Sequence, residues 1–357
     1  MSETVISASP HIRSRVTTKR IMIDVAIALL PCCVASIVFF GWYSLAIIAI
    51  SVATASLTEI VYALIYNKAW KDFKNKLVGT LRAFDFTSVV TGIILALVLP
   101  TAYNVKGEII PLPWFVPFLG AIFAIALCKM LFGGTGRNLV NPADTARVFL
   151  LISFTTYMTA CVGTCVIEPI TKLTADSSEI LSGATPLAEI LKGNAGAISN
   201  IDLLLGTGID GSMGETCKIA IIIGYLYLCA RKVIKWYYPL IYIATAGLFA
   251  SALEWDITYF LPSILSGGLL FGAVFMATDY STSPKSTLAN VIYFVCLGLL
   301  NAGLRKALAT VDSFVEVTSF CILLMNCITP LLDRYIPRRP FGYVRQKKIK
   351  AEKEAKQ

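Results

Sequence analysis

The chain has 357 residues, 56% of them hydrophobic, and its mean hydropathy is +0.72. Soluble globular domains hold about 45–50% apolar residues, so this composition excludes a soluble globule and indicates an integral membrane protein. The single histidine, His11, argues against zinc centres, bis-histidine haem and histidine-based triads, and the net charge of +9 lies mostly outside the apolar segments.

Ten segments are apolar and long enough, or nearly so, to cross a bilayer as helices, which takes about 20 residues. They are residues 21–40, 44–66, 86–100, 114–132, 145–161, 217–235, 237–253, 261–279, 287–305 and 313–332. The first lacks a small-residue cleavage site and is predicted to be a retained helix. The third and seventh are short, and Pro100 at the end of the third predicts a tilted, broken or partly buried helix. We therefore expect an all-α integral membrane protein with about ten transmembrane helices.

Five segments precede a long polar loop and five follow it, so the second half must enter the membrane from the opposite side. This arrangement predicts two inverted five-helix repeats. A weak match between residues 91–96 (TGIILA) and 267–272 (GGLLFG) agrees with it. The predicted parts are a tail at 1–20, repeats at 21–161 and 217–333, the loop at 162–216 and a basic tail at 334–357.

Lys and Arg set the predicted orientation, because they accumulate in cytoplasmic loops. Most of the 31 lie in the two tails and in the loops after even-numbered segments. Both termini are therefore predicted to be cytoplasmic, and the loop 162–216 to face outward. The outward side holds few basic residues, namely Lys106, Lys172, Lys192, Lys218, Arg305 and Lys306.

The motif Ser182-Gly183-Ala184-Thr185-Pro186 lies in the outward loop. Its small residues leave the Thr185 hydroxyl group open to a bulky group, and Pro186 favours an extended backbone at Thr185. The motif therefore predicts an accessible threonine hydroxyl group. The alternative is a flexible loop that precedes an N-capped helix.

A glycine-rich stretch, residues 132–149, joins the fourth and fifth segments and contains Asn138 and Asn141. Each amide offers a donor and an acceptor, which suits the imide edge or polyol chain of an uncharged ligand such as a flavin. The alternative for Asn141, directly before Pro142, is to cap the fifth helix. The two roles are compatible.

Three acidic residues are candidates for ion handling. Asp24 and Glu59 lie in the first and second segments, and Asp279 ends the eighth within the polar cluster 277–284. An ionisable side chain at the centre of a span costs about 2.5–3.5 kcal/mol on insertion scales, so its presence suggests a function. The alternative for Asp24 and Glu59 is snorkelling or helix capping near the interface.

The ten cysteines mostly fall in apolar segments without a C-x-x-C pair, which predicts small buried hydrophobic residues. Cys161, Cys165 and Cys217 lie near the ends of the central loop. A disulfide or an iron–sulfur cluster is the alternative for these three.

Four motifs, taken together and in this order, resemble the D subunit of the Rnf electron-transport complex, a relative of the B subunit of the sodium-pumping NADH:quinone reductase. The resemblance covers nearly the whole chain, from Arg20 to Gly342. The motifs are Ser182–Leu187, GGTGRNLVNPADTARVF at 133–149, MATDYSTSP at 276–284 and LMNCITPLLDR at 324–334.

The resemblance implies FMN joined by a phosphoester to Thr185 and installed by a separate flavin transferase. It also implies a noncovalent riboflavin inside the helical bundle, with Asn138 and Asn141 matching the family's amide pair. One departure concerns the carboxylate that relatives often carry shortly before the motif, because Asp176 lies further upstream here.

The implied activity is that of an ion-translocating ferredoxin:NAD+ oxidoreductase, a translocase of the bacterial inner membrane that moves Na+ or H+. The implied partners are the A, B, C, E and G subunits of the Rnf complex, together with membrane lipid.

Two alternatives remain at this point. A solute channel or carrier also uses inverted repeats but leaves the Thr185 motif unexplained. The quinone-linked relatives usually have a longer N-terminal extension than this chain. Nucleic-acid binding is not expected, because the basic tail offers only Phe341 and Tyr343 for stacking.

Overall fold

A computed structural model describes residues 16–66, 73–105, 108–159, 199–206, 211–308 and 317–337. Within these ranges the fold is helical apart from one antiparallel hairpin, β1 (Ala102–Val105) and β2 (Glu108–Pro111), in which Tyr103 pairs with Ile110. The helices are α1 (Thr18–Phe40), α2 (Trp42–Tyr66), α3 (Phe73–Ala83), α4 (Thr87–Leu97), α5 (Phe115–Ile122), the π-helix η1 (Phe123–Met130), α6 (Pro142–Ser153), α7 (Thr155–Thr159), α9 (Asn200–Leu205), α10 (Lys218–Ala230), α11 (Tyr237–Glu254), the 3-10 helix η3 (Ile257–Tyr259), α12 (Phe260–Leu265), α13 (Leu269–Phe271), the π-helix η4 (Gly272–Met276), α14 (Thr287–Ala307) and α15 (Thr318–Tyr335).

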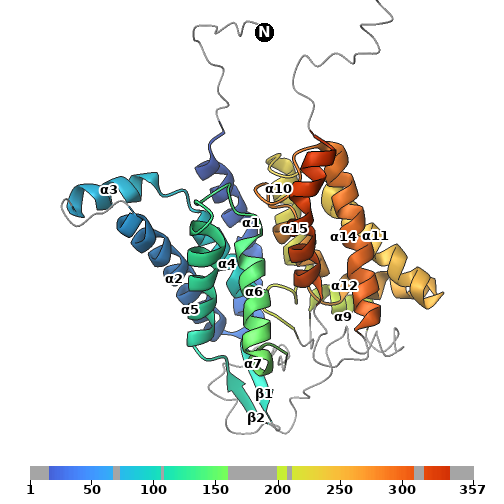
Figure 1. Ribbon diagram of the computed structural model, residues 1–357. Coiled ribbons are helices and arrows are strands. Elements are labelled where there is room, and N and C mark those ends of the chain that lie inside the picture. The colour runs from blue at the N-terminus through green and yellow to red at the C-terminus, as the bar shows by residue number, and fades with distance from the viewer. Residues whose placement is uncertain are drawn as a thin grey trace, which may run out of the picture.

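The helices form one bundle in which the two halves of the chain lie side by side (Figure 1). Helix α1 packs against α10, so the first helix of each half forms part of the joint between the halves. The start of α1 and the end of α15 lie at the same end of the bundle, whereas the hairpin and α7 lie at the opposite end. The described chain thus begins and ends at the same end of the bundle, and the cytoplasmic location of both termini stays a prediction.

The surface of the bundle is that of a membrane protein. Helices α1, α2 and α14 are each long and apolar enough to cross a membrane, and two bent helix pairs raise the number from 3 to 5 among the described residues. Large apolar side chains such as Leu30 and Val34 on α1 point out of the bundle, where lipid would cover them. The helical membrane class is confirmed, and the count of ten spans and the inverted repeat remain predictions.

The third predicted segment is broken, as its length and Pro100 indicated. Only α4, with 11 residues, is helical, and α3 meets it at a bend of 65°. After α4 the chain continues as buried, non-helical backbone through Thr101. The carbonyl groups of Leu97, at the end of α4, and of Leu99 accept hydrogen bonds from the end of the central loop, since Gly214 N donates to Leu97 O at 2.6 Å and Met213 N donates to Leu99 O at 3.2 Å.

The eighth predicted segment is also broken, although the sequence predicted one continuous helix over 261–279. Its two parts bend by 70° around residues 266–268, and Gly267 adopts a φ of 63°. Arg305 Nη1 donates to Ser263 O at 2.9 Å, and Lys218 Nζ donates to Gly267 O at 3.4 Å. These cations satisfy carbonyl groups at the end of α12, because a helix C-terminus attracts positive charge.

Lys218 and Arg305 are therefore not loop residues on the outward side. They are 4% and 3% exposed and are held within the bundle. Their charges must be left out of the orientation argument, which the remaining basic residues still support.

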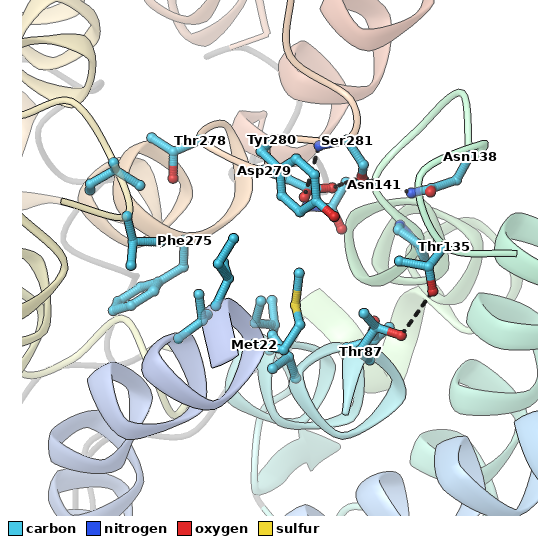
Figure 2. Close-up of a pocket in the computed structure, with 18 of the residues that line it drawn as sticks. Met22, Thr87, Thr135, Asn138, Asn141, Phe275, Thr278, Asp279, Tyr280 and Ser281 are labelled. Carbon is cyan, nitrogen blue, oxygen red and sulfur yellow. Dashed lines mark hydrogen bonds between the residues drawn. The ribbon is translucent and has the colours of Figure 1, made fainter. Parts of the chain in front are cut away.

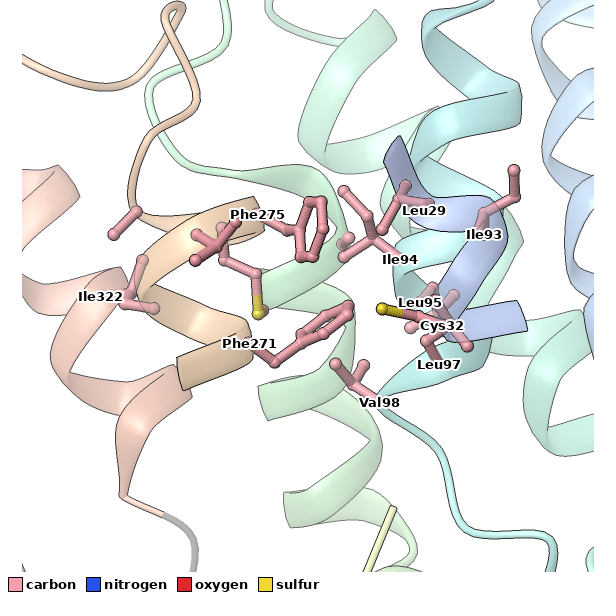
Figure 3. Packing of buried hydrophobic residues seen from close by; sticks show 14 of the residues in the cluster. Leu29, Cys32, Ile93, Ile94, Leu95, Leu97, Val98, Phe271, Phe275 and Ile322 are labelled. Atoms are coloured by element: carbon pink, nitrogen blue, oxygen red, sulfur yellow. The ribbon is translucent and has the colours of Figure 1, made fainter. Parts of the chain in front are cut away.

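Buried apolar side chains fill the space where the two halves meet (Figure 3). Phe271 and Phe275 of the second half point toward the side chains of α1 and α4, among them Leu29, Ile94 and Leu97. Their rings lie 5.2 Å apart between centroids.

The cysteine prediction is correct for part of the set. Cys32, Cys128 and Cys321 are buried, but Cys296 and Cys327 are exposed on the surface of the bundle. Cys217 carries a free thiol group, and Cys161 and Cys165 lie outside the described residues.

Gly224 on α10 tests the joint between the halves. A Cβ atom there would collide with Ala28 O and lie 2.8 Å from the Phe275 ring, so Gly224→Ala forces α1 and α10 apart. We expect it to lower stability by about 1–3 kcal/mol, as overpacking does. Thermal unfolding of the protein in detergent measures the effect.

The matched control is Gly303→Ala on α14, where the nearest atom to the added Cβ lies at 3.8 Å. This variant should be neutral or slightly more stable, because alanine favours a helix by about 0.5–1 kcal/mol over glycine. Equal stability of the two variants would contradict the packing of α1 on α10.

Candidate functional site

A cavity of about 270 Å³ lies between the two halves, at the end of the bundle where α1 begins. Its wall combines the first turns of α1 and α4, the chain between η1 and α6, the end of α10 and the end of η4. The apolar lining is Ile21, Met22, Val25, Val90, Ile94, Pro142, Leu228, Val233, Ile234, Val274 and Phe275. The polar lining is Thr87, Thr91, Lys129, Thr135, Asn138, Asn141, Thr278, Asp279, Tyr280 and Ser281.

The two kinds of side chain are unevenly distributed around the cavity. Figure 2 shows Asn138, Ser281 and Thr135 gathered on one side, whereas Met22 and Phe275 approach from the other. A mostly apolar cleft with a few directed polar groups is the usual form of a small-molecule site. The arrangement suits a flat, largely uncharged ligand with one polar edge.

Asn141 connects the cavity wall to two helices. Its amide oxygen accepts from Ala143 N at 3.1 Å, so it caps the N-terminus of α6 as the Asn-Pro pair predicted. Its amide nitrogen donates to Met276 O at 3.1 Å, at the end of η4. The capping interpretation is confirmed, and the same residue also holds the two halves together at the cavity.

Asn138 lies on the irregular chain before α6, and its amide nitrogen donates to Ser281 Oγ at 3.3 Å and to Val140 O at 3.4 Å. The segment is not helical, so the spacing of three does not place the two amides on one helix face. Both nevertheless line the same cavity because the chain folds back against η4.

Of the three acidic candidates, Asp279 lines the cavity. Its carboxylate accepts from the Ser281 hydroxyl group at 2.7 Å and from the Thr282 hydroxyl group at 3.4 Å. These bonds hold the turn that follows η4 and thereby the side chain of Ser281 at the cavity edge.

Glu59 lies behind the cavity wall rather than in it. Its carboxylate pairs with Lys129 Nζ at 2.7 Å, and Lys129, 2% exposed, does line the cavity. Lys129 also donates to the Thr87 hydroxyl group, which donates to Asp85 Oδ1 at 2.6 Å. Sequence reasoning gave no role to Lys129 or Asp85, although a lysine within an apolar segment is itself a signal of function.

Asp24 does not reach the cavity lining. It forms an ion pair with Arg231 at 3.1 Å and accepts from the Tyr227 hydroxyl group at 3.3 Å. Because Asp24 is on α1 and its partners are on or next to α10, the pair fastens the two helices together.

The predicted attachment motif, Ser182, Gly183, Ala184 and Thr185, lies outside the described residues. The described chain resumes after it with α9 and then inserts residues 211–216 into the bundle. There Glu215, 3% exposed, pairs with Arg147 of α6 at 2.8 Å. The C-terminal end of the loop is thus anchored inside the bundle by this ion pair to α6, the helix that Asn141 caps.

The sequence matches the NQR2, RnfD, RnfE family over residues 5–342. It is 37% identical to the D subunit of the Na+-translocating ferredoxin:NAD+ oxidoreductase complex of Acetobacterium woodii, over 96% of both chains. It is 31% identical to the D subunit of the proton-translocating ferredoxin:NAD+ oxidoreductase complex of Clostridium ljungdahlii, over 94% of this chain and 96% of the relative. The D subunit of the ion-translocating oxidoreductase complex of Stutzerimonas stutzeri is 32% identical, over 92% and 93%. The chain therefore belongs to the NQR2, RnfD, RnfE family, in which these relatives are D subunits of ion-translocating oxidoreductase complexes.

Proposed function

We propose that the chain is the D subunit of an Rnf-type ferredoxin:NAD+ oxidoreductase complex in the bacterial inner membrane. In this function it passes electrons through FMN on Thr185 and through a noncovalent riboflavin in the cavity, and the transfer is coupled to movement of Na+ or H+. The A, B, C, E and G subunits of the Rnf complex would be its partners, and a flavin transferase would attach the FMN. The names and full-length similarity of the relatives support the complex.

The flavin proposal rests on one observation, which is that Asn138 and Asn141 line the same cavity. A flavin supplies electron transfer at its ring, and the protein supplies position and electrostatics. The apolar side chains of Met22 and Phe275 suit the faces of such a ring, and the amides of Asn138 and Asn141 suit its imide edge or its polyol chain. Lys129 lines the cavity as one half of an ion pair with Glu59 at 2.7 Å, so it adds a polar donor without a net charge.

Electron transfer by itself moves no ion, so coupling requires a group whose charge or accessibility depends on the ligand's redox state. Glu59 is suited to this role because its partner Lys129 lines the cavity. Asp279 is suited as well because it lines the cavity directly. The relatives' names include both sodium- and proton-translocating complexes, so they support either ion.

A solute carrier is not favoured by the relatives' names. The quinone-linked relative remains within the same family description. The three relatives compared are, however, all named as D subunits, two of ferredoxin:NAD+ oxidoreductase complexes and one of an ion-translocating oxidoreductase complex.

Thr185→Val tests the covalent site. Expressed with its flavin transferase, the variant should lose the flavin fluorescence that the wild-type band retains in a denaturing gel, because valine has no hydroxyl group to esterify. Thr174→Val, in the same loop, is the matched control and should remain fluorescent. A fluorescent Thr185→Val band would refute this attachment site.

Asn138→Leu tests the noncovalent site. We expect at least tenfold less extractable riboflavin with covalent FMN unchanged, because the variant loses a polar contact at the cavity edge while Asn141 still caps α6. Flavin released by acid and separated by chromatography gives the measurement.

Asn141 separates binding from folding. Asn141→Leu should lose riboflavin and at least about 1 kcal/mol of stability, since it removes both the helix cap and the hydrogen bond to Met276 O, whereas Asn141→Ser keeps a capping oxygen and loses only the bond to Met276 O. For the Asn138→Leu variant of the preceding test, an equal loss of covalent FMN and noncovalent riboflavin would indicate misfolding. That result would count against the cavity as the riboflavin site.

A further inference from the structure

Asp144 is a buried acid that the proposed electron path does not use. It lies in the first turn of α6, is 0% exposed, and neither of its carboxylate oxygens makes a hydrogen bond with the described residues. An ionised carboxylate in an apolar interior is costly unless it is paired and hydrogen-bonded. The unpartnered oxygens therefore call for a bound proton or a bound cation.

The groups around Asp144 do not neutralise it. Arg147, one turn along α6, faces the carboxyl group, but its charge is balanced by Glu215 at 2.8 Å. Ser319 faces Asp144 from α15, yet its hydroxyl group and the carboxylate oxygens do not meet in hydrogen-bond geometry. The other titratable neighbours are Tyr293 of α14 and Cys321 of α15, which carry no positive charge.

The surroundings suit a proton better than a metal cation. An alkali cation needs several oxygen atoms to replace its hydration shell. The groups that face the carboxylate are Arg147, the Ser319 hydroxyl group, the Tyr293 hydroxyl group and the Cys321 thiol group, which together offer only two neutral oxygen atoms. In the part of the chain that the structure describes, no group of three or more His, Cys, Asp or Glu side chains gathers to hold a metal.

Asp144 is also connected to the cavity. The cap residue Asn141 lines the cavity, and its amide oxygen accepts from Asp144 N at 3.5 Å. The carboxyl group lies at the positive end of α6, which stabilises the ionised form and so permits the proton to leave. Asp144 is thus one hydrogen bond away from a residue that lines the cavity, so a change of charge in the cavity would act on this acid at short range.

We propose that Asp144 is a proton-binding site inside the membrane, occupied by a proton at neutral pH. One O–H bond forms on the carboxylate when the proton binds, and the same bond breaks when the proton returns to water. An electron added in the cavity strengthens proton binding, and its removal weakens it; this coupling rests on the proposed function, whereas the proton site itself does not.

Infrared spectroscopy of the purified complex at pH 7 tests the site. The wild type should show the carbonyl band of a protonated carboxylic acid, and Asp144→Asn, which resembles the neutral acid in shape and charge, should lose that band completely. Asp256→Asn, which removes an exposed carboxyl group, is the control and should keep it. If Asp144→Asn does not assemble, Ser319→Ala should shift the band, because Ser319 faces the acid.

A wild-type spectrum in which Asp144 contributes only carboxylate bands at pH 7 would overturn the proposal. So would an acid band that appears only when sodium is removed at constant pH, because the occupant would then be an alkali cation. Chemical reduction of the complex tests the coupling between Asp144 and the cavity separately from the proposed function. If the Asp144 band does not change on reduction while noncovalent flavin is present, the coupling is contradicted. If the purified complex contains no noncovalent flavin, the proposed function is contradicted instead.

Discussion

Non-helical backbone deep inside a membrane protein must find hydrogen-bond partners within the protein, because lipid offers none. The chain meets this constraint at two places. At the end of α4 and just after it, the carbonyl groups of Leu97 and Leu99 accept from the inserted segment at Gly214 and Met213. At the break before α13, Arg305 and Lys218 donate to carbonyl groups that the interrupted helix leaves without a backbone partner. The short helices on either side of these breaks frame the joint between the halves, and the cavity lies at one end of that joint.

The inserted segment connects the loop that is predicted to face outward with the cavity wall. Glu215 pairs with Arg147 on α6, and the first turn of the same helix carries Asp144 and is capped by Asn141. A single helix of 12 residues thus contacts the anchored end of the loop and the cavity wall.

The sequence predicted those features that arise from local pattern. Apolar length located α1, α2 and α14, and the Asn141-Pro142 pair located the cap of α6. It also assigned Asn138 and Asn141 to one ligand, and both line the cavity, but it did not predict that Asp279 lines the same cavity. The break at Gly267 was missed because its stabilising cations, Lys218 and Arg305, are distant in sequence and looked like loop residues. The sequence could not show that Glu59 and Asp24 lie outside the cavity lining, because their ion pairs with Lys129 and Arg231 depend on how the helices pack.

The central claim is that a flavin occupies the cavity between the two halves. A density map of the intact complex, isolated from its native membrane, tests it most directly. Planar density between Met22 and Phe275, with its polar edge toward Asn138, is the expected result. Lipid or water in that cavity, with the noncovalent flavin found elsewhere in the protein, would contradict the claim.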